Sequence, residues 1–201
     1  IKMKIGVRLG TTLNEDYAFM SGEHDEGEQG MQPALIMYDD DKDSFWAVGI
    51  DAKGATEAMV QYGVGVIDQS GYIGETITFK SDQEPSIVAL KNSISAARVG
   101  ETVPIESPVR ASKSNGMMEN AVKIWQWQLR TIKHYVESRI GKVVEPGIAL
   151  FTWLIPFCAD ILNKFRVGAG SHTAHERITS HACKVARVGF AEVVDFKLET
   201  D

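Results

Sequence analysis

The chain has 201 residues, of which 44% are hydrophobic and 24% are charged, a composition typical of an ordinary globular domain. A net charge of −6 argues against a basic surface that binds nucleic acid indiscriminately, although it allows a local basic strip. The two cysteines occur in contexts that predict no disulfide framework, so we expect a reducing compartment. No apolar run reaches the roughly 20 residues that a membrane-spanning helix needs, so no membrane association is expected.

The first part of the chain is typical of β-structure. Residues 16–23 predict the first strand, and an acidic, glycine-rich loop follows them. Residues 33–39 and 44–51 predict a hairpin. The acidic turn between them, 39–43, is more typical of a solvated turn than of an ion-binding loop.

Helical and strand patterns then alternate. The segment 55–71 predicts a helix, although two internal glycines weaken the pattern. Residues 76–82 alternate between apolar and polar side chains and predict a strand. The segment 85–100 begins with proline and ends with glycine, as helices often do, and a short strand is predicted over 102–107.

The last part of the chain is predominantly helical. The most regular pattern runs from about Met117 to Ile140, with apolar residues every three or four positions, and a second apolar helix is predicted over 148–165. This order of elements predicts a layered α/β domain. We expect residues 1–180 to form that domain, and residues 181–201 to be a C-terminal extension that starts a small, truncated β unit.

Three carboxylates occupy informative positions. Asp16 opens the first predicted strand, Asp82 ends the strand 76–82, and Glu119 lies in the expected first turn of the long helix. Three such groups at strand ends and a helix start would form an oxygen-ligand site for Mg²⁺ or Mn²⁺. Two such ions about 4 Å apart promote phosphoryl transfer by activating the attacking oxygen and stabilising the leaving one.

Each carboxylate also has a structural interpretation. A glutamate in a first helical turn is more often a partner of the helix dipole, which applies to Glu119. Asp82 could cap the helix that follows it. Asp16 is the hardest to explain structurally, because a carboxylate in an apolar strand needs a partner.

Taken together, these motifs resemble a known family. The stretches "KSDQEP" and "SPVRASKSNGMMENAVKIWQWQLR" are similar to the catalytic core of retroviral-type integrases, most of all those in the Pol polyproteins of copia-type LTR retrotransposons. That family has an Asp, Asp, Glu triad and a polar loop before the glutamate. The resemblance covers roughly residues 12–200, and its motif positions are Asp16, Asp82, Ser112, Ser114, Asn115, Gly116 and Glu119.

The resemblance implies an RNase H-like fold, a five-stranded mixed sheet flanked by helices. It also implies that the triad holds two Mg²⁺ (or Mn²⁺) ions and carries out DNA integration. In the first step water attacks near the 3′ end of the element DNA, and the freed 3′-hydroxyl then attacks target DNA. The implied contacts to DNA phosphates come from two groups, the helix residues Lys123, Gln126 and Arg130 and the flexible-loop residues Lys113 and Asn115.

The same resemblance implies element ends and target DNA as ligands, a homo-oligomer, and other Pol polyprotein modules as partners. It implies action in the nucleus after passage through cytoplasmic particles. Because the chain starts at Ile1 rather than Met, we expect it to be part of a longer polypeptide whose targeting signal lies elsewhere. Two alternatives remain, a nuclease of the same fold and an inactive remnant that binds DNA or a partner. A zinc site is not predicted, because no common ligand spacing matches His172, His175, His181 and Cys183.

Overall fold

The computed structural model describes residues 11–20, 32–106, 112–184 and 189–192. Its centre is one five-stranded sheet with the strand order β3-β2-β1-β4-β5. β1 pairs antiparallel with β2 and parallel with β4, so the sheet is mixed, as expected. The strands are β1 (Thr11–Met20), β2 (Gln32–Asp39), β3 (Ser44–Gly49), β4 (Ile77–Ser81) and β5 (Thr102–Glu106).

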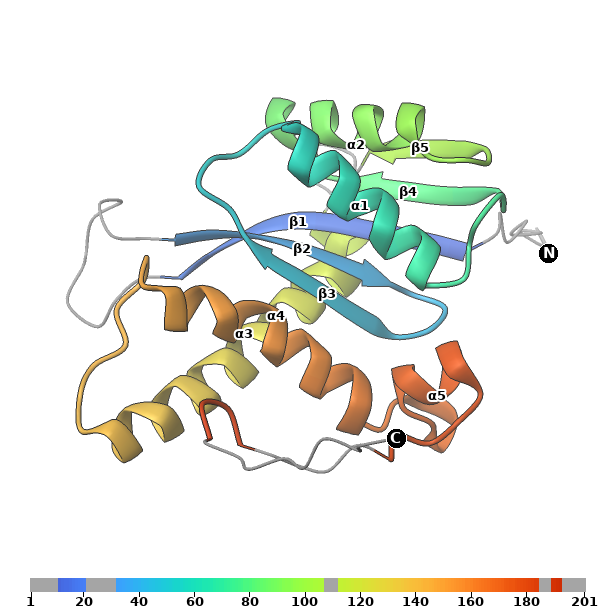
Figure 1. The fold of residues 1–201 in the computed structure, drawn as a ribbon. Helices are drawn as coiled ribbons and strands as arrows, with labels where there is room; N and C mark the ends of the chain where they lie inside the picture. Colours follow the sequence, from blue (N-terminus) through green and yellow to red (C-terminus); the bar gives the residue numbers. More distant parts are fainter. Residues whose placement is uncertain (1–10, 21–31, 107–111, 185–188, 193–201) are drawn as a thin grey trace, which may run out of the picture.

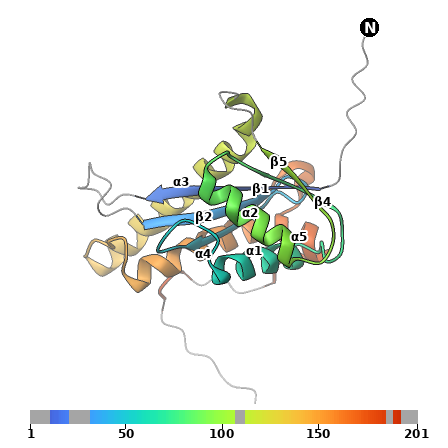
Figure 2. The ribbon, with the colours of Figure 1, turned by 90° about the horizontal axis from the view of Figure 1, so that it is seen from above.

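Helices cover both faces of this sheet (Figure 1). The first two lie on one face and the long pair lies on the other, so the chain forms three layers (Figure 2). A short 3₁₀ turn and a last helix follow the long pair. The helices are α1 (Glu57–Gln69), α2 (Pro85–Ala97), α3 (Ser112–Ile140), α4 (Ala149–Phe165), η1 (Ala169–Ser171) and α5 (Ala174–Thr179). Among the described residues, no helix has the length and apolar character needed to cross a bilayer.

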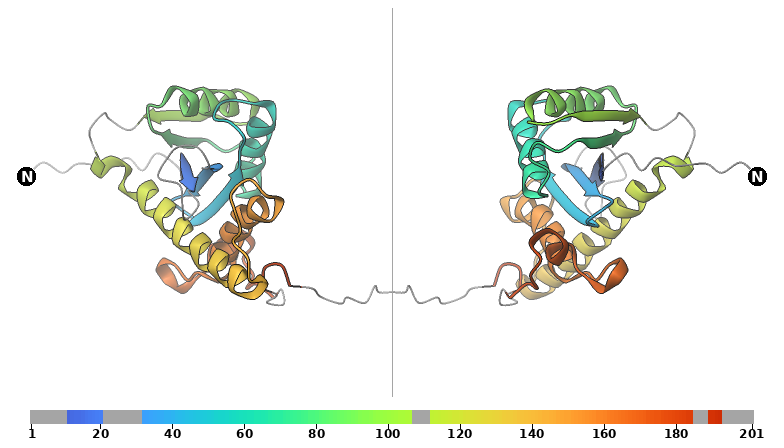
Figure 3. Two further views of the ribbon diagram at one scale, coloured as in Figure 1. Left: turned by 90° about the vertical axis from the view of Figure 1, so that its left-hand side faces the viewer. Right: turned by 90° about the vertical axis from the view of Figure 1, so that its right-hand side faces the viewer.

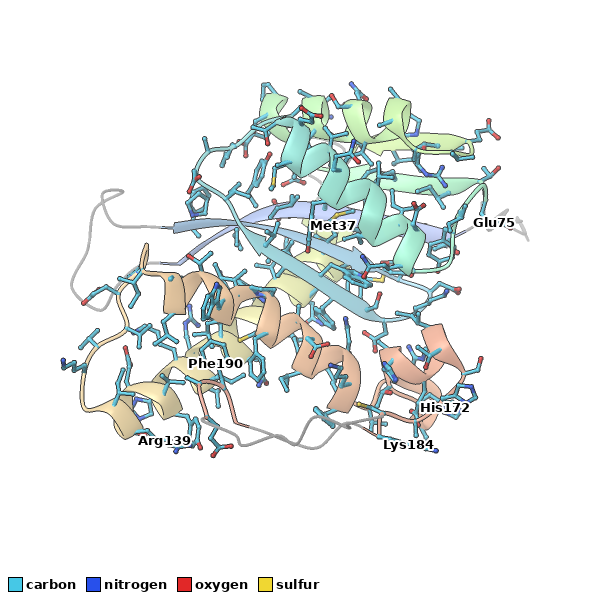
Figure 4. All side chains as sticks on the ribbon, in the orientation of Figure 1. Met37, Glu75, Arg139, His172, Lys184 and Phe190 are labelled. Carbon is cyan, nitrogen blue, oxygen red and sulfur yellow. The ribbon has the colours of Figure 1, made fainter. Side chains whose placement is uncertain are left out.

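Two apolar cores, one on each face, hold the layers together. On the face of α1 and α2, Met37 of β2 points into the core beneath α1 (Figure 4). Here the helices approach so closely that a Cβ at Gly63 would collide with the side chain of Ile94, which explains a glycine inside a helix. On the face of α3 and α4, Trp125 is fully buried and donates a hydrogen bond from Nε1 to the Ile155 carbonyl oxygen at 3.2 Å.

The first strand begins five residues earlier than its sequence pattern indicates. Thr11 pairs with Ile77 of β4, and Leu13 pairs with Asp39 of β2. Asp16 is therefore the sixth residue of a ten-residue strand and does not open it. Pairing with two neighbours sets this boundary, and such non-local hydrogen bonds leave no local trace in the sequence. The predicted strand residues 21–23 lie outside the described residues.

The long helix also begins earlier than predicted. The sequence "SKSNG" favours a loop, yet α3 starts at Ser112, so Lys113 and Asn115 lie in helical turns and not in a loop over the site. Once a helix has nucleated, each further residue adds one hydrogen bond for one residue fixed, a better ratio than nucleation has, so extension from the formed helix is favoured over starting a new one. Glu119 is consequently the eighth helical residue, beyond the first turn where a dipole role is strongest.

The prediction of a solvated acidic turn between β2 and β3 is wrong for two of its residues. Asp39 is fully buried and accepts hydrogen bonds from the Tyr72 hydroxyl at 2.8 Å and from the Asp41 backbone N–H at 2.9 Å. Asp43 pairs with Arg166 of the distant segment after α4 at 2.7 Å. These carboxylates anchor the turn to the rest of the fold.

Part of the predicted C-terminal extension packs on the domain. Phe190 lies beneath α4 (Figure 4), with its ring centroid 4.8 Å from that of Phe157. Glu192 forms an ion pair with Arg139 of α3 at 2.9 Å. Residues 193–201 of this extension, where the small β unit was expected, lie outside the described residues.

Candidate active site

The first predicted ligand, Asp16, lies on the central strand of the sheet. Side chains alternate along a strand, so Asp16 shares a face with Ala18, which packs in the core beneath α3 and α4. Its Oδ1 accepts a hydrogen bond from the Tyr17 backbone N–H at 2.8 Å. The side chain is partly exposed and thus accessible from the carboxyl end of the strand.

The second predicted ligand, Asp82, directly follows β4. The parallel register pairs Glu15 with Ser81, so the next position places Asp82 beside Asp16. The structure therefore brings two of the three predicted ligands together, where the parallel pairing of β1 with β4 ends and just beyond the carboxyl end of β4, the edge at which α/β proteins commonly form their sites. Asp82 is not the N-cap of α2, because that position belongs to Glu84.

The electrostatics of this pair are unfavourable for two ionised carboxylates. Burial raises the pKa of Asp16 to about 6, and repulsion from Asp82 and from Glu84 adds to the rise. The Tyr17 N–H and the positive charge of Lys53 act in the opposite direction. A carboxyl group with a raised pKa beside other carboxylates is a common property of functional sites.

Two residues at this site, Lys53 and Glu84, were not singled out by the sequence patterns. Lys53, in the loop between β3 and α1, donates hydrogen bonds to both carboxylate oxygens of Glu84 at 2.7 and 2.9 Å. Glu84 lies only two residues after Asp82, and this short spacing is the sequence signal that could have identified it as part of the site. No local signal could identify Lys53, which is 31 residues away from its partner.

The third predicted ligand, Glu119, is not part of this group. It lies on α3 with an exposed side chain. The first turns of α3 project from the body of the fold (Figures 2 and 3), whereas Met118, directly before Glu119, is buried in the core. Among the residues that the structure describes, no three His, Cys, Asp or Glu side chains come together to hold a metal ion. Asp16 and Asp82 fit a divalent cation, because their oxygen atoms can ligate it and its charge would relieve their mutual repulsion. Glu119 does not complete this set of ligands in the structure.

The predicted DNA-contacting residues of α3 form one strip. Lys123 and Arg130 are exposed, as phosphate-contacting residues must be. Gln126 is half-buried, and its Nε2 donates a long hydrogen bond of 3.5 Å to the carbonyl oxygen of Phe19 in β1. This contact shows that the strip faces the end of β1, three residues beyond Asp16.

A second ionisable pair lies behind the site, on the opposite face of β1. Both carboxylate oxygens of Glu15 are buried without a hydrogen-bond partner among the described residues, and burial raises its pKa well above the usual value. The positive charge of Lys91 opposes this rise. Lys91 is itself fully buried and donates to the Ile105 carbonyl oxygen at 3.1 Å. The sequence patterns did not single out either residue.

A cavity of about 670 Å³ lies elsewhere, beside the edge strand β3. Apolar and polar side chains of β3, α1, α4 and α5 line it, including Trp46, Tyr62 and His175. Neither Asp16 nor Asp82 contributes to its walls. The acidic pair therefore lies outside this cavity.

Comparisons with known proteins agree on the fold. No protein-family model matches the chain, and no curated protein matches it. Among solved structures, the catalytic core domain of BIV integrase matches with a TM-score of 0.53 at 14% identity, covering 84% of this chain and 93% of that one. The HTLV-2 integrase catalytic core domain in complex with magnesium matches with a TM-score of 0.55 at 11% identity, covering 82% of this chain and 93% of that one.

A third structure extends the comparison. A chain of the simian T-cell lymphotropic virus intasome in complex with PP2A regulatory subunit B56 gamma matches with a TM-score of 0.57 at 13% identity, covering 93% of this chain and 60% of that one. Identities this low establish the fold and leave the activity open. The chain therefore has the RNase H-like fold of retroviral integrase catalytic cores, as the sequence resemblance implied.

Proposed function

We propose that this chain is the catalytic core of an integrase from a copia-like LTR retrotransposon Pol polyprotein. Its reactions would be metal-dependent 3′-end processing of element DNA and strand transfer into target DNA. The observation that carries the proposal is the Asp16–Asp82 pair where the parallel pairing of β1 with β4 ends, with the raised pKa of Asp16. The integrase-like fold and the sequence motifs around Asp82 and Glu119 support the same assignment.

In this proposal Asp16, Asp82 and Glu119 hold Mg²⁺ or Mn²⁺. Two bound ions would supply activation of the attacking oxygen and stabilisation of the leaving one. The protein's own residues then have positioning tasks. Asp16 and Asp82 supply fixed oxygens on a rigid sheet, and Tyr17 holds one oxygen of Asp16 in place through its backbone N–H.

Glu119 must approach the pair for the triad to form. It lies seven residues before Gln126 on the same helix face, which is about 10 Å along the axis at 1.5 Å per residue. Met118, directly before Glu119, is already buried in the core that holds Ala18 of β1, so the Glu119 side chain itself has to turn toward the acidic pair. We propose that the metal ions and the DNA stabilise that arrangement.

The polar strip on α3 is proposed to hold the DNA. Lys123 and Arg130 would contact phosphates, and Gln126 would lie closest to the reacting strand. Lys113 and Asn115, in the first turns of α3, would join them. Such contacts position a duplex without reading its sequence. Other copies of the chain and other Pol modules are the proposed protein partners, and the nucleus is the proposed place of action.

A disintegration assay tests this function, because resolving a branched oligonucleotide that mimics the insertion product requires only the core. With Mn²⁺ or Mg²⁺ present, we expect the chain to resolve the branch. Asp16→Asn, Asp82→Asn and Glu119→Gln should each reduce the product to the background level. Glu145→Gln, an exposed carboxylate in the loop before α4, is the matched control and should keep full activity.

Two results would change the assignment. A folded wild-type chain that binds DNA but resolves no branch with either ion would identify the inactive remnant that was the alternative. Activity that survives Glu119→Gln but is lost in Glu84→Gln would replace the proposed third ligand with the carboxylate that already lies near the pair.

A further inference from the structure

An exposed aromatic ring lies on the same strand as Asp16. Phe19 is 44% exposed at the carboxyl end of β1. It comes three residues after Asp16, roughly 10 Å along the strand at 3.3 Å per residue, and the alternation of side chains places it on the opposite face of β1 from Asp16. Single exposed apolar residues are common on protein surfaces, so the exposure alone does not indicate a function. The residues around this ring do.

A cation lies over the ring. The Nζ of Lys53 is 4.7 Å from the ring centroid of Phe19 and 5.0 Å from that of Tyr17. The loop that carries Lys53 is fixed, because the backbone N–H of Gly54 donates to the Tyr17 hydroxyl at 3.1 Å. An aromatic face and an ammonium group are thus held together at the same edge of the sheet.

The acidic partner of Lys53 is also held in place. Glu84 accepts hydrogen bonds from Lys53 and from the Ser86 hydroxyl at 2.7 Å, and these outweigh burial and lower the pKa of Glu84. The ion pair is partly exposed, with 30% of the Lys53 side chain and 40% of the Glu84 side chain accessible. An exposed pair of this kind contributes little stability, so a phosphate can compete for the lysine at little loss.

The combination suits one class of ligand. Bases of unpaired nucleotides stack on aromatic side chains, and each stacked base contributes about 1–3 kcal/mol. A lysine beside the ring can contact the phosphate of the same nucleotide. Stacked DNA rises 3.4 Å per base, so the backbone positions of Phe19 and Asp16 are about three base steps apart, and a DNA strand that reaches both side chains has to cross the end of the sheet.

We propose that Phe19 and Lys53 form a subsite for an unpaired nucleotide at a DNA end, beside the phosphodiester that reacts at Asp16 and Asp82. The base stacks on the ring of Phe19, and Lys53 contacts its phosphate. Gln126, bonded to the carbonyl oxygen of Phe19, connects this subsite with the strip on α3. The subsite rests on the proposed function, because it needs DNA at the acidic pair.

Fluorescence titrations can test the subsite with two DNA ligands. One is a blunt duplex, and the other is a duplex of the same length with a two-nucleotide overhang that carries 2-aminopurine, a base whose fluorescence falls on stacking. We expect the wild-type chain to quench the overhang and to bind it roughly tenfold more tightly than the blunt end, in the range of one stacked base. Phe19→Ala should lose both effects and keep its affinity for the blunt duplex.

Matched variants separate stacking from charge and from folding. Phe19→Trp should keep the quenching, because it keeps the aromatic face. Trp153→Ala, which removes an exposed ring from α4 on the other side of the fold, should change nothing. Lys53→Ala should weaken both duplexes and lower the salt dependence by about one phosphate contact, whereas Lys53→Arg should restore it.

The outcomes distinguish the subsite from the proposed function. Retained quenching and retained overhang preference in a folded Phe19→Ala variant would overturn the subsite. Equal wild-type affinity for both duplexes, together with an active disintegration reaction, would overturn the subsite and leave the function standing. Failure of the wild-type chain to bind either duplex would overturn both.

Discussion

Two groups of aspartates in this chain have opposite electrostatic surroundings. The turn between β2 and β3 and the region where the pairing of β1 with β4 ends both concentrate negative charge in a partly buried place. In the turn, Asp43 accepts a hydrogen bond from the Tyr38 hydroxyl at 2.8 Å and pairs with Arg166 at 2.7 Å. Where β1 and β4 stop pairing, Asp16 instead faces Asp82 and Glu84, and the Tyr17 backbone N–H and the positive charge of Lys53 oppose their repulsion.

This difference distinguishes carboxylates that stabilise the fold from carboxylates that are suited to binding a ligand. Buried carboxylates that stabilise a fold have donors arranged around them, as Asp39 does with Tyr72 and two backbone N–H groups. Carboxylates that repel one another weaken the fold unless something outside the chain neutralises them. The same substitution, aspartate to asparagine, should therefore have opposite effects on stability in the two groups.

The largest expected change is in the turn. Asp43→Asn keeps the shape of the side chain and tolerates the left-handed backbone at this position, where φ is 55°. It leaves Arg166 without its anion, so we expect the free energy of unfolding to fall by about 2–3 kcal/mol, less than for a fully buried pair because the Arg166 side chain is 32% exposed. Urea denaturation at pH 7 measures this. An unchanged midpoint would show that the ion pair is not a structural anchor.

The second prediction concerns Asp16 and its dependence on pH. Its folded-state pKa of about 6 lies above the ordinary value of 3.8, so the folded chain binds the proton more tightly than the unfolded chain does. That stabilisation is complete below about pH 4 and is lost as the pH rises through 6. Asp16→Asn should thus be more stable than the wild type by about 1–2 kcal/mol at pH 8, after discounting for partial exposure.

Thermal unfolding at pH 8 and at pH 4 gives the comparison. The asparagine variant should melt at a higher temperature at pH 8 and close to the wild type at pH 4, where both side chains are neutral. A variant that is less stable at pH 8 would mean that a cation on the chain already neutralises Asp16.

The smallest effect should come from the metal ion itself. Mn²⁺ or Mg²⁺ at several times its Kd should stabilise the wild-type chain by about 1 kcal/mol, because the ion binds only the folded state. Removal with a chelator should reverse the gain. Asp82→Asn should abolish this increase in stability. Asp43→Asn should keep the increase, although its stability without the ion is lower. An equal increment in both variants would place the ion away from the acidic pair.

Much of the fold could be predicted from local patterns. The helices α1, α2 and α4 and the hairpin of β2 and β3 follow from apolar periodicity and from proline and glycine punctuation, with boundaries close to those observed. The capping box of α5 has the same local origin, because Thr173 and Glu176 are three residues apart and exchange hydrogen bonds with each other's backbone. Such features depend on neighbours in the chain, which a sequence displays directly.

The tertiary structure decides which residues far apart in the sequence come into contact. The sequence by itself determined that Asp16, Asp82 and Glu119 are candidate ligands and that the fold is α/β. Pairing of β1 with β4 brought Asp16 beside Asp82, and the same packing placed Lys53 beside Glu84 and Arg166 beside Asp43. It also left Glu119 apart on α3. These relations depend on strand register and helix packing, and the hydrogen bonds and contacts that set them join residues far apart in the chain.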